Sequence, residues 1–142
     1  MPVINVRITN INGNRNEKAK IKDNIEIKSN FRIVSTKMEK DNSGENLLRV
    51  NFSFDVQYNP SVGDIELKGY LLYKSPDLNK LVKESDDKIT LEPDIIKEIS
   101  TVILRESLLE SSMIARKLRL PVPIRLPEIT AKFQATEFAK AS

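Results

Sequence analysis

Glu106 and Glu110 are the residues whose type and spacing could do chemistry most directly. They lie four residues apart on one face of a predicted helix, where two carboxylates could serve as an acid and a base. The chain contains no histidine and no cysteine, which excludes histidine general bases, thiol nucleophiles, disulfides and the usual zinc sites. Pairing with cations of a neighbouring chain, or exposure to solvent, explains the two glutamates equally well. We therefore expect a protein that is not an enzyme and that uses no cofactor and no metal.

The composition is that of one ordinary domain, which we assign to residues 1–142. Hydrophobic residues make up 39% of the chain and charged residues 30%, with 23 cations against 20 anions. The net charge of +3 is spread over both halves, so the charge alone does not indicate a nucleic-acid-binding arm. We expect a cytoplasmic protein, because no stretch is apolar enough to span a bilayer and the first residues alternate like a strand.

The first half of the chain has the alternation of β-strands. The clearest case runs from Leu48 to Tyr58, where every second residue is large and apolar. A turn cluster at 59–63 separates it from a second alternating run, so the two should form a hairpin. The expected strands cover about residues 4–9, 25–33, 48–58 and 65–73. Four antiparallel strands in meander order, within about 3–74, are the simplest arrangement.

The second half, about 76–142, changes to a helical period. Ser75-Pro76-Asp77 is typical of a helix start and predicts a short helix reaching about Glu84, followed by a charged loop. Pro93 opens the main helix, which we expect to run to about Leu118. These elements predict an α+β fold in which a four-stranded antiparallel sheet is covered on one face by the long helix.

Apolar residues occupy two neighbouring arcs of this helix. The first arc, which we expect to lie on the sheet, contains Ile95, Ile96, Ile99, Val102, Ile103, Leu109, Met113 and Ile114. The second arc contains Ser100, Leu104, Ser107, Leu108, Ser111 and Ala115, with Leu118 at its end. Either the two arcs form one wide core stripe with scattered surface leucines, or the second arc is a subunit contact. We favour the contact, and so expect a homo-oligomer, a dimer or a tetramer.

A proline-stiffened segment follows the helix. Pro121, Pro123 and Pro127 hold the backbone near an extended geometry, so apolar side chains between them could be presented to a ligand. The same side chains could instead close one end of the core.

Two stretches resemble the SecB export-chaperone family. NFSFDVQYNPSVGDIELKGYLLY (51–73) resembles the third and fourth strands of that family. ILRESLLESSMIARKLRLPVPIRLPEI (103–129) resembles its helix and the proline loop that follows. The chain differs from SecB in being slightly basic and in lacking a tail that could bind zinc. The resemblance implies an ATP-independent holdase, outside or inside protein transport, whose partners are unfolded or preprotein polypeptides.

The resemblance also implies a hydrophobic peptide groove. Its candidate residues are Leu120, Val122, Ile124, Leu126, Ile129, Phe133 and Phe138.

The alternative is a nucleic-acid-binding or structural assembly subunit that uses the antiparallel sheet. Candidate phosphate contacts are Lys18, Lys20, Lys22, Arg32 and Arg49. The exposed side of the strand from Leu48 to Tyr58 carries no aromatic residue, so we do not expect nucleic acid as a partner.

Overall fold

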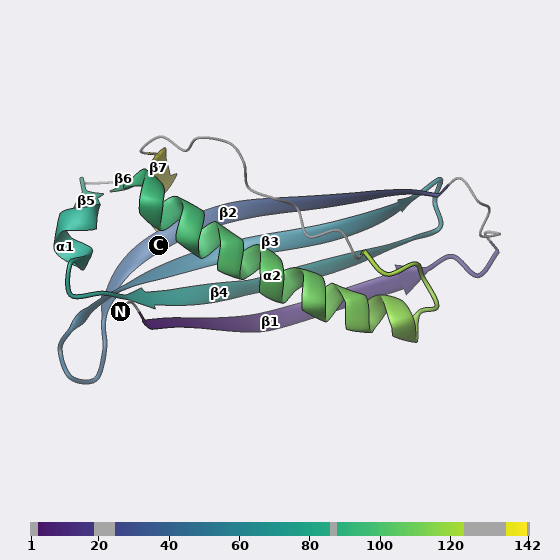
Figure 1. Cartoon of the computed structure of the whole chain (residues 1–142), viewed down its shortest axis with the longest axis horizontal. Coiled ribbons are helices and arrows are strands. Elements are labelled where there is room, and N and C mark those ends of the chain that lie inside the picture. The colour runs from purple at the N-terminus through teal and green to yellow at the C-terminus, as the bar shows by residue number, and fades with distance from the viewer. Residues whose placement is uncertain (1–2, 19–24, 86–87, 124–135, 142) are drawn as a thin grey trace.

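The computed structural model describes residues 3–18, 25–85, 88–123 and 136–141. It is an α+β fold, as the alternation and the helical period predict. A four-stranded antiparallel sheet carries the long helix α2 across one face, and a small three-stranded sheet lies at one end (Figure 1). We call the face of the large sheet that packs against α2 the inner face, and the opposite one the polar face.

The large sheet contains β1 (Val3–Arg15), β2 (Glu26–Lys40), β3 (Asn46–Asn59) and β4 (Gly63–Lys74). Their spatial order is β1-β4-β3-β2. The predicted meander is right for the last three strands but wrong for β1, which pairs with β4 and not with β2. The connection from β1 to β2 is too long for a tight hairpin, and it takes the chain to the far edge of the sheet in a Greek-key order.

The alternation in β3 sorts its side chains onto the two faces. Its inner-face residues are Leu48, Val50, Phe52, Phe54, Val56 and Tyr58, and all are buried. The residues between them face the other way and are half-buried or exposed. The predicted hairpin with β4 is confirmed, with Val56 paired to Ile65 and Leu48 to Tyr73.

The small sheet is built from segments far apart in the sequence. After the short helix α1 (Leu78–Leu81), β5 (Val82–Glu84) pairs with β6 (Lys88–Leu91), and β6 pairs on its other side with β7 (Thr136–Ala139). The predicted helix reaching Glu84 is wrong beyond Leu81, where the chain becomes extended. Burial of Val82, Ile89 and Leu91 beneath α2 outweighs local helix preference here.

Helix α2 (Pro93–Lys117) begins at the predicted proline and ends within one residue of the predicted end. The helix ends before Pro121, so another feature terminates it. Arg119 adopts a left-handed conformation with φ of 55°, and its N–H donates to the carbonyl of Arg116. The N–H of Leu120 donates to the carbonyl of Ala115 at 2.8 Å, which completes a Schellman motif. The Arg15 guanidinium on β1 donates to the carbonyl of Leu118 at 3.0 Å and so caps the helix.

The rotation of α2 about its axis differs from the expectation. The second arc (Ser100, Leu104, Ser107, Leu108, Ser111 and Ala115) is buried inside the single chain, so these residues are core and not a free surface for another subunit. The first arc is buried only in its N-terminal half, where the small sheet also covers the helix. Further along, Leu109 and Met113 are 57% and 58% exposed. The three serines alternate with Leu104 and Leu108 on this side, so small side chains and buried leucines together face the large sheet.

Candidate functional site

The residues predicted to form a peptide groove are only partly described, and the described ones are not a continuous exposed wall. Leu120 is 4% exposed and belongs to the core cluster of Tyr58, Val62 and Ala115. Its side chain also lies over Gly63, at the start of β4. The expectation that Leu120 is presented to a ligand therefore does not hold, and the segment closes one end of the core at this residue.

The other predicted groove residues divide into two groups. Val122 is half-buried, and Phe138 on β7 is half-buried against the core beside its register partner Ile89. Ile124, Leu126, Ile129 and Phe133 lie outside the described residues.

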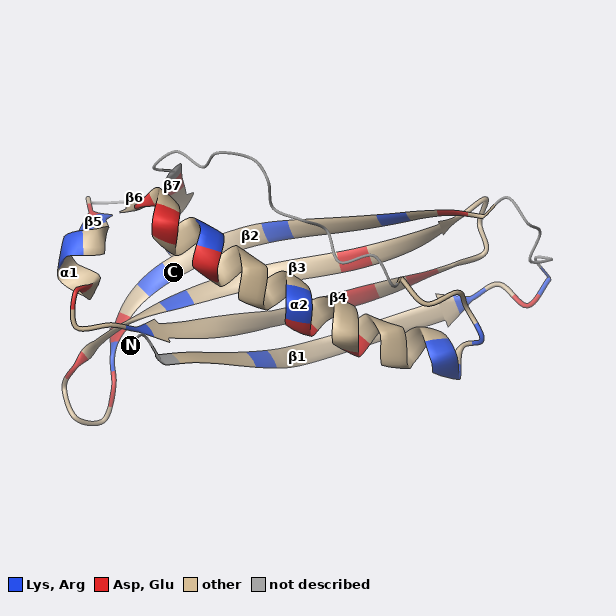
Figure 2. Cartoon of the chain, viewed as in Figure 1, with Lys and Arg blue, Asp and Glu red and all other residues tan. Residues whose placement is uncertain are grey.

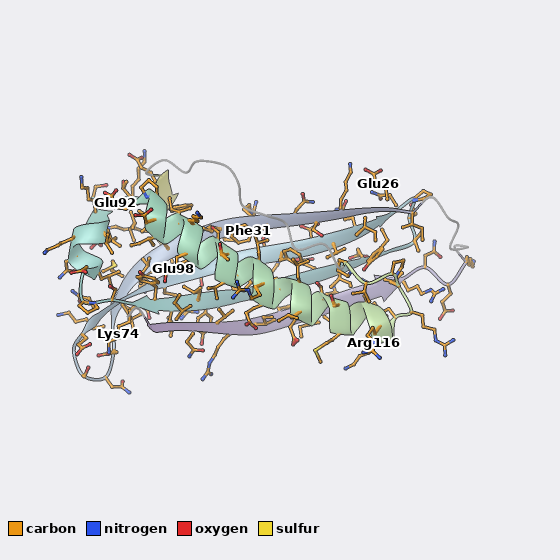
Figure 3. All side chains as sticks on the ribbon, in the orientation of Figure 1. Glu26, Phe31, Lys74, Glu92, Glu98 and Arg116 are labelled. Carbon is orange, nitrogen blue, oxygen red and sulfur yellow. The ribbon has the colours of Figure 1, made fainter. Side chains whose placement is uncertain are left out.

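The structure shows an exposed apolar position that the sequence argument did not single out. Ile27 on β2 faces the inner side, paired with the buried Tyr58, yet it is 38% exposed. Helix α2 runs diagonally over the sheet and packs against β1, β3 and β4, so the first half of β2 lies beyond it (Figure 1). Phe31 follows on the same side of the strand and is half-buried beside α2 (Figure 3).

The outer edge of β2 is largely unpaired in the described part of the chain. Toward its C-terminal half, Thr36 forms a bridge with Lys140 and accepts a hydrogen bond from the N–H of Ala141 at 2.8 Å. No described strand forms a β-ladder with the edge from Glu26 to Ser35, although β7 contacts β2 near the bridge at Thr36. Among the described strands nothing pairs with this edge, because β1 pairs with β4 on the other side of the sheet, whereas the expected meander would have placed β1 against it.

We call this surface the β2 ledge. It consists of the inner-face side chains of Ile27, Ser29 and Phe31 together with the unpaired edge from Glu26 to Ser35. It offers apolar contact and free backbone donors and acceptors to the same ligand. Such a combination suits an extended polypeptide, which can add as a further strand.

A cavity of about 540 Å³ lies at the opposite end of the sheet among residues 44–46, 74–76 and 78–79. Lys74 is its only described cation, and it is held by Asp41 at 2.5 Å and Glu45 at 2.8 Å. These two carboxylates raise the pKa of Lys74, so the amine stays protonated. It is therefore unsuited to act as a nucleophile or a base.

Glu106 and Glu110 do not form part of an enclosed site. Glu106 is exposed and Glu110 is half-buried on α2, because the helix turns its serine side and not this side toward the sheet. Among the described residues, no cation lies within 4.0 Å of either carboxylate. Of the explanations considered for this pair, exposure to solvent fits this arrangement.

The chain matches no family model, no curated protein and no solved structure. In the described part of the chain, neither helix is sufficiently long and apolar to cross a bilayer.

Proposed function

We propose that this chain is an ATP-independent holdase that binds unfolded polypeptide, preproteins among its clients, along the β2 ledge. The observation that carries the proposal is the exposure of Ile27 on the apolar side of the sheet, next to a strand edge that has no described partner. A cytoplasmic location and a kinship with SecB-like chaperones belong to the same proposal. They are supported by the resemblance of 51–73 and 103–129.

The ledge can hold a client without regard to its sequence. Backbone hydrogen bonds to an added strand depend on main-chain groups alone, and each contributes about 0.5–1.5 kcal/mol net. Client side chains that point inward would cover Ile27 and Phe31. Full burial of one such aliphatic residue contributes about 1.5–3 kcal/mol. A few of these contacts together give weak, reversible capture, which a holdase needs.

The test is suppression of aggregation of an unrelated, chemically unfolded protein. Replacing two residues of the ledge, Ile27→Lys and Ser29→Lys, should abolish suppression, because charge replaces the apolar contact of Ile27 and both lysines disfavour the addition of a strand. The matched control is Ile11→Lys. Ile11 is 54% exposed on β1, at the other edge of the same sheet, so this variant should suppress aggregation like the wild type.

Two results would count against the proposal. One is full suppression by the Ile27→Lys, Ser29→Lys variant. The other is an equal loss in the Ile11→Lys control, which would indicate unspecific hydrophobic binding. Circular dichroism on each variant shows whether the fold is kept.

We further propose that the chain forms a homo-oligomer through the outer side of α2. Leu109 and Met113 lie one turn apart and are the exposed large apolar residues of this helix. Covering them with a second copy would remove this apolar area from water.

Light scattering at tens of micromolar should show a dimer or tetramer. The Leu109→Lys, Met113→Lys variant should shift the mass to that of the 16.2 kDa chain. A monomeric wild type would rule the oligomer out.

A further inference from the structure

The polar face of the large sheet carries a group of cations that the proposed function does not use. Strand register places three neighbouring rows of side chains on this face, running from β1 through β4 and β3 to β2. The rows are Asn10, Lys68, Ser53 and Arg32; then Arg7, Tyr70, Asn51 and Ser35; then Asn5, Leu72, Arg49 and Lys37. We call these rows the cationic patch.

Acidic residues are absent from the three rows and begin in the next one. There Glu66 on β4 pairs with Asp55 on β3, and Asp64 follows on the same side. Figure 2 shows these acidic bands on β3 and β4 lying together toward one end of the sheet, with basic bands on β1, β2 and β3 toward the other. Apart from Lys28, which contacts Glu26 at 3.7 Å, and Glu39, which follows Lys37 on β2, the polar face has a positive and a negative half.

Most cations of the patch are available to a ligand. Lys68 contacts Glu66 at 3.3 Å. For Arg7, Arg32, Lys37 and Arg49, no carboxylate lies within 4.0 Å in the described part of the chain. Arg7, Arg32, Lys37 and Lys68 are exposed.

The centre of the patch is held in place by hydrogen bonds and stacking. The Arg49 guanidinium lies over the Tyr70 ring, 4.1 Å from its centroid. Its Nε donates to Asn51 Oδ1 at 3.3 Å, and Asn51 Nδ2 donates to Ser35 Oγ at 2.9 Å. This arrangement fixes a planar cation and an aromatic ring before any ligand arrives, so little ordering entropy is lost on binding.

We propose that the cationic patch binds single-stranded nucleic acid. Lys68, Arg32, Arg7 and Lys37 surround the centre and can neutralise phosphates, while the Arg49–Tyr70 pair offers planar groups for a base to stack on. The side-chain amides of Asn10 and Asn51 add donors and acceptors for base edges. The acidic half repels phosphate and confines the strand to the positive half.

The shape of the patch favours a single strand over a duplex. Strands about 4.8 Å apart and alternate residues about 6.8 Å apart give a nearly flat area of about 14 by 14 Å. In the described chain, no helix projects from this face to enter a major groove. A single strand can lie flat with its bases on the sheet. The polar side of β3 carries no aromatic residue, but the register brings Tyr70 of β4 beside Asn51.

The experiment is fluorescence anisotropy with a labelled twelve-nucleotide oligo(dT) over a range of salt concentrations. With three or four phosphates neutralised, the logarithm of the binding constant should fall with log salt at a slope of about −2 to −3. Replacing Arg32→Gln and Arg49→Gln should weaken binding at least tenfold, and it should make this slope shallower by about 0.7, because only Arg32 of the two neutralises a phosphate. Tyr70→Leu should weaken binding about fivefold or more through lost stacking. Asp55→Asn with Glu66→Gln should tighten it.

The charge-matched control is Lys97→Gln with Arg105→Gln, two exposed cations on α2 at the other side of the molecule. It should bind like the wild type. An absence of binding at low salt, or an equal loss in this control, overturns the proposal. So does a Tyr70→Leu variant with unchanged affinity, or equal competition by poly-glutamate, because either result would assign the patch to unspecific attraction of anions.

Discussion

The Tyr58 hydroxyl on β3 donates a hydrogen bond to the backbone carbonyl of Pro121 at 2.6 Å. The ring itself is 1% exposed, and burial raises the pKa of Tyr58 to about 12, so the hydroxyl remains a donor through the neutral and mildly alkaline range. Sixty-three residues separate the two partners. The bond ties the start of the proline segment to the sheet, next to Leu120, which is already in the core.

Tyr58→Phe should destabilise the fold by about 1–2 kcal/mol, because the partly buried Pro121 carbonyl would lose its partner while the ring stays packed. Urea unfolding measured by circular dichroism gives this value. The control is Tyr70→Phe, since no described group hydrogen-bonds to that hydroxyl. A loss in Tyr58→Phe no larger than in the control would show that the bond contributes nothing to stability.

The adjacent residues Leu108 and Leu109 should respond to substitution in opposite ways. Leu108 is 3% exposed and packs on the large sheet, whereas Leu109 faces outward. Leu108→Ala should lower the free energy of unfolding by about 2–5 kcal/mol, and Leu109→Ala should lower it by about 0.5 kcal/mol or less in the monomer. Thermal and urea denaturation at low protein concentration measure both. Equal losses would contradict the helix rotation described above.

Ser107→Ala should stabilise the protein. The Ser107 hydroxyl is fully buried between α2 and the sheet and has no hydrogen-bond partner among the described residues. An unsatisfied buried hydroxyl lowers the free energy of unfolding by about 1–3 kcal/mol. Alanine removes the hydroxyl and also favours the helix. Ser111→Ala is the matched control, since its hydroxyl donates to the carbonyl of Leu108 at 3.2 Å. We expect a higher melting temperature for Ser107→Ala, and a smaller change or a decrease for the control.

The loop between β2 and β3 should make stability depend on pH through Asp41. The Lys74 ammonium holds the pKa of Asp41 well below its usual range, and hydrogen bonds from Ser43 and from the Glu45 backbone lower it further. A carboxyl with a depressed folded-state pKa adds stability above its unfolded value, near 4, and loses that contribution as pH falls. Asp41→Asn should therefore melt below the wild type at pH 7, and the difference should shrink between pH 4 and pH 2.

A pH-independent difference would contradict this role of Asp41. The comparison variant is Glu45→Gln. Glu45 contacts the same ammonium at 2.8 Å but is 64% exposed, so this variant should change the melting temperature less at pH 7.

The sequence by itself determined the elements whose signals are local. The unbroken alternation from Leu48 to Tyr58 predicts a strand with one buried face, and turn residues at 59–63 predict the hairpin with β4. Pro93 sets the start of α2, and a long apolar helix beside amphipathic strands implies an α+β packing. These features hold because side-chain period and proline geometry act within a few residues.

Only the tertiary structure decided which neighbours these elements have. The first arc of α2 carries only large apolar residues and the second carries three serines, yet the serine side lies on the sheet and leaves Leu109 and Met113 outside. The apolar pattern of the helix alone therefore pointed to the wrong side. The short β5, β6 and β7 carry too little periodicity to be predicted, and they are stabilised by one another and by α2. The β2 ledge and the cationic patch both depend on strand order and register. Those are chosen by packing between residues tens of positions apart, which no local pattern in the sequence records.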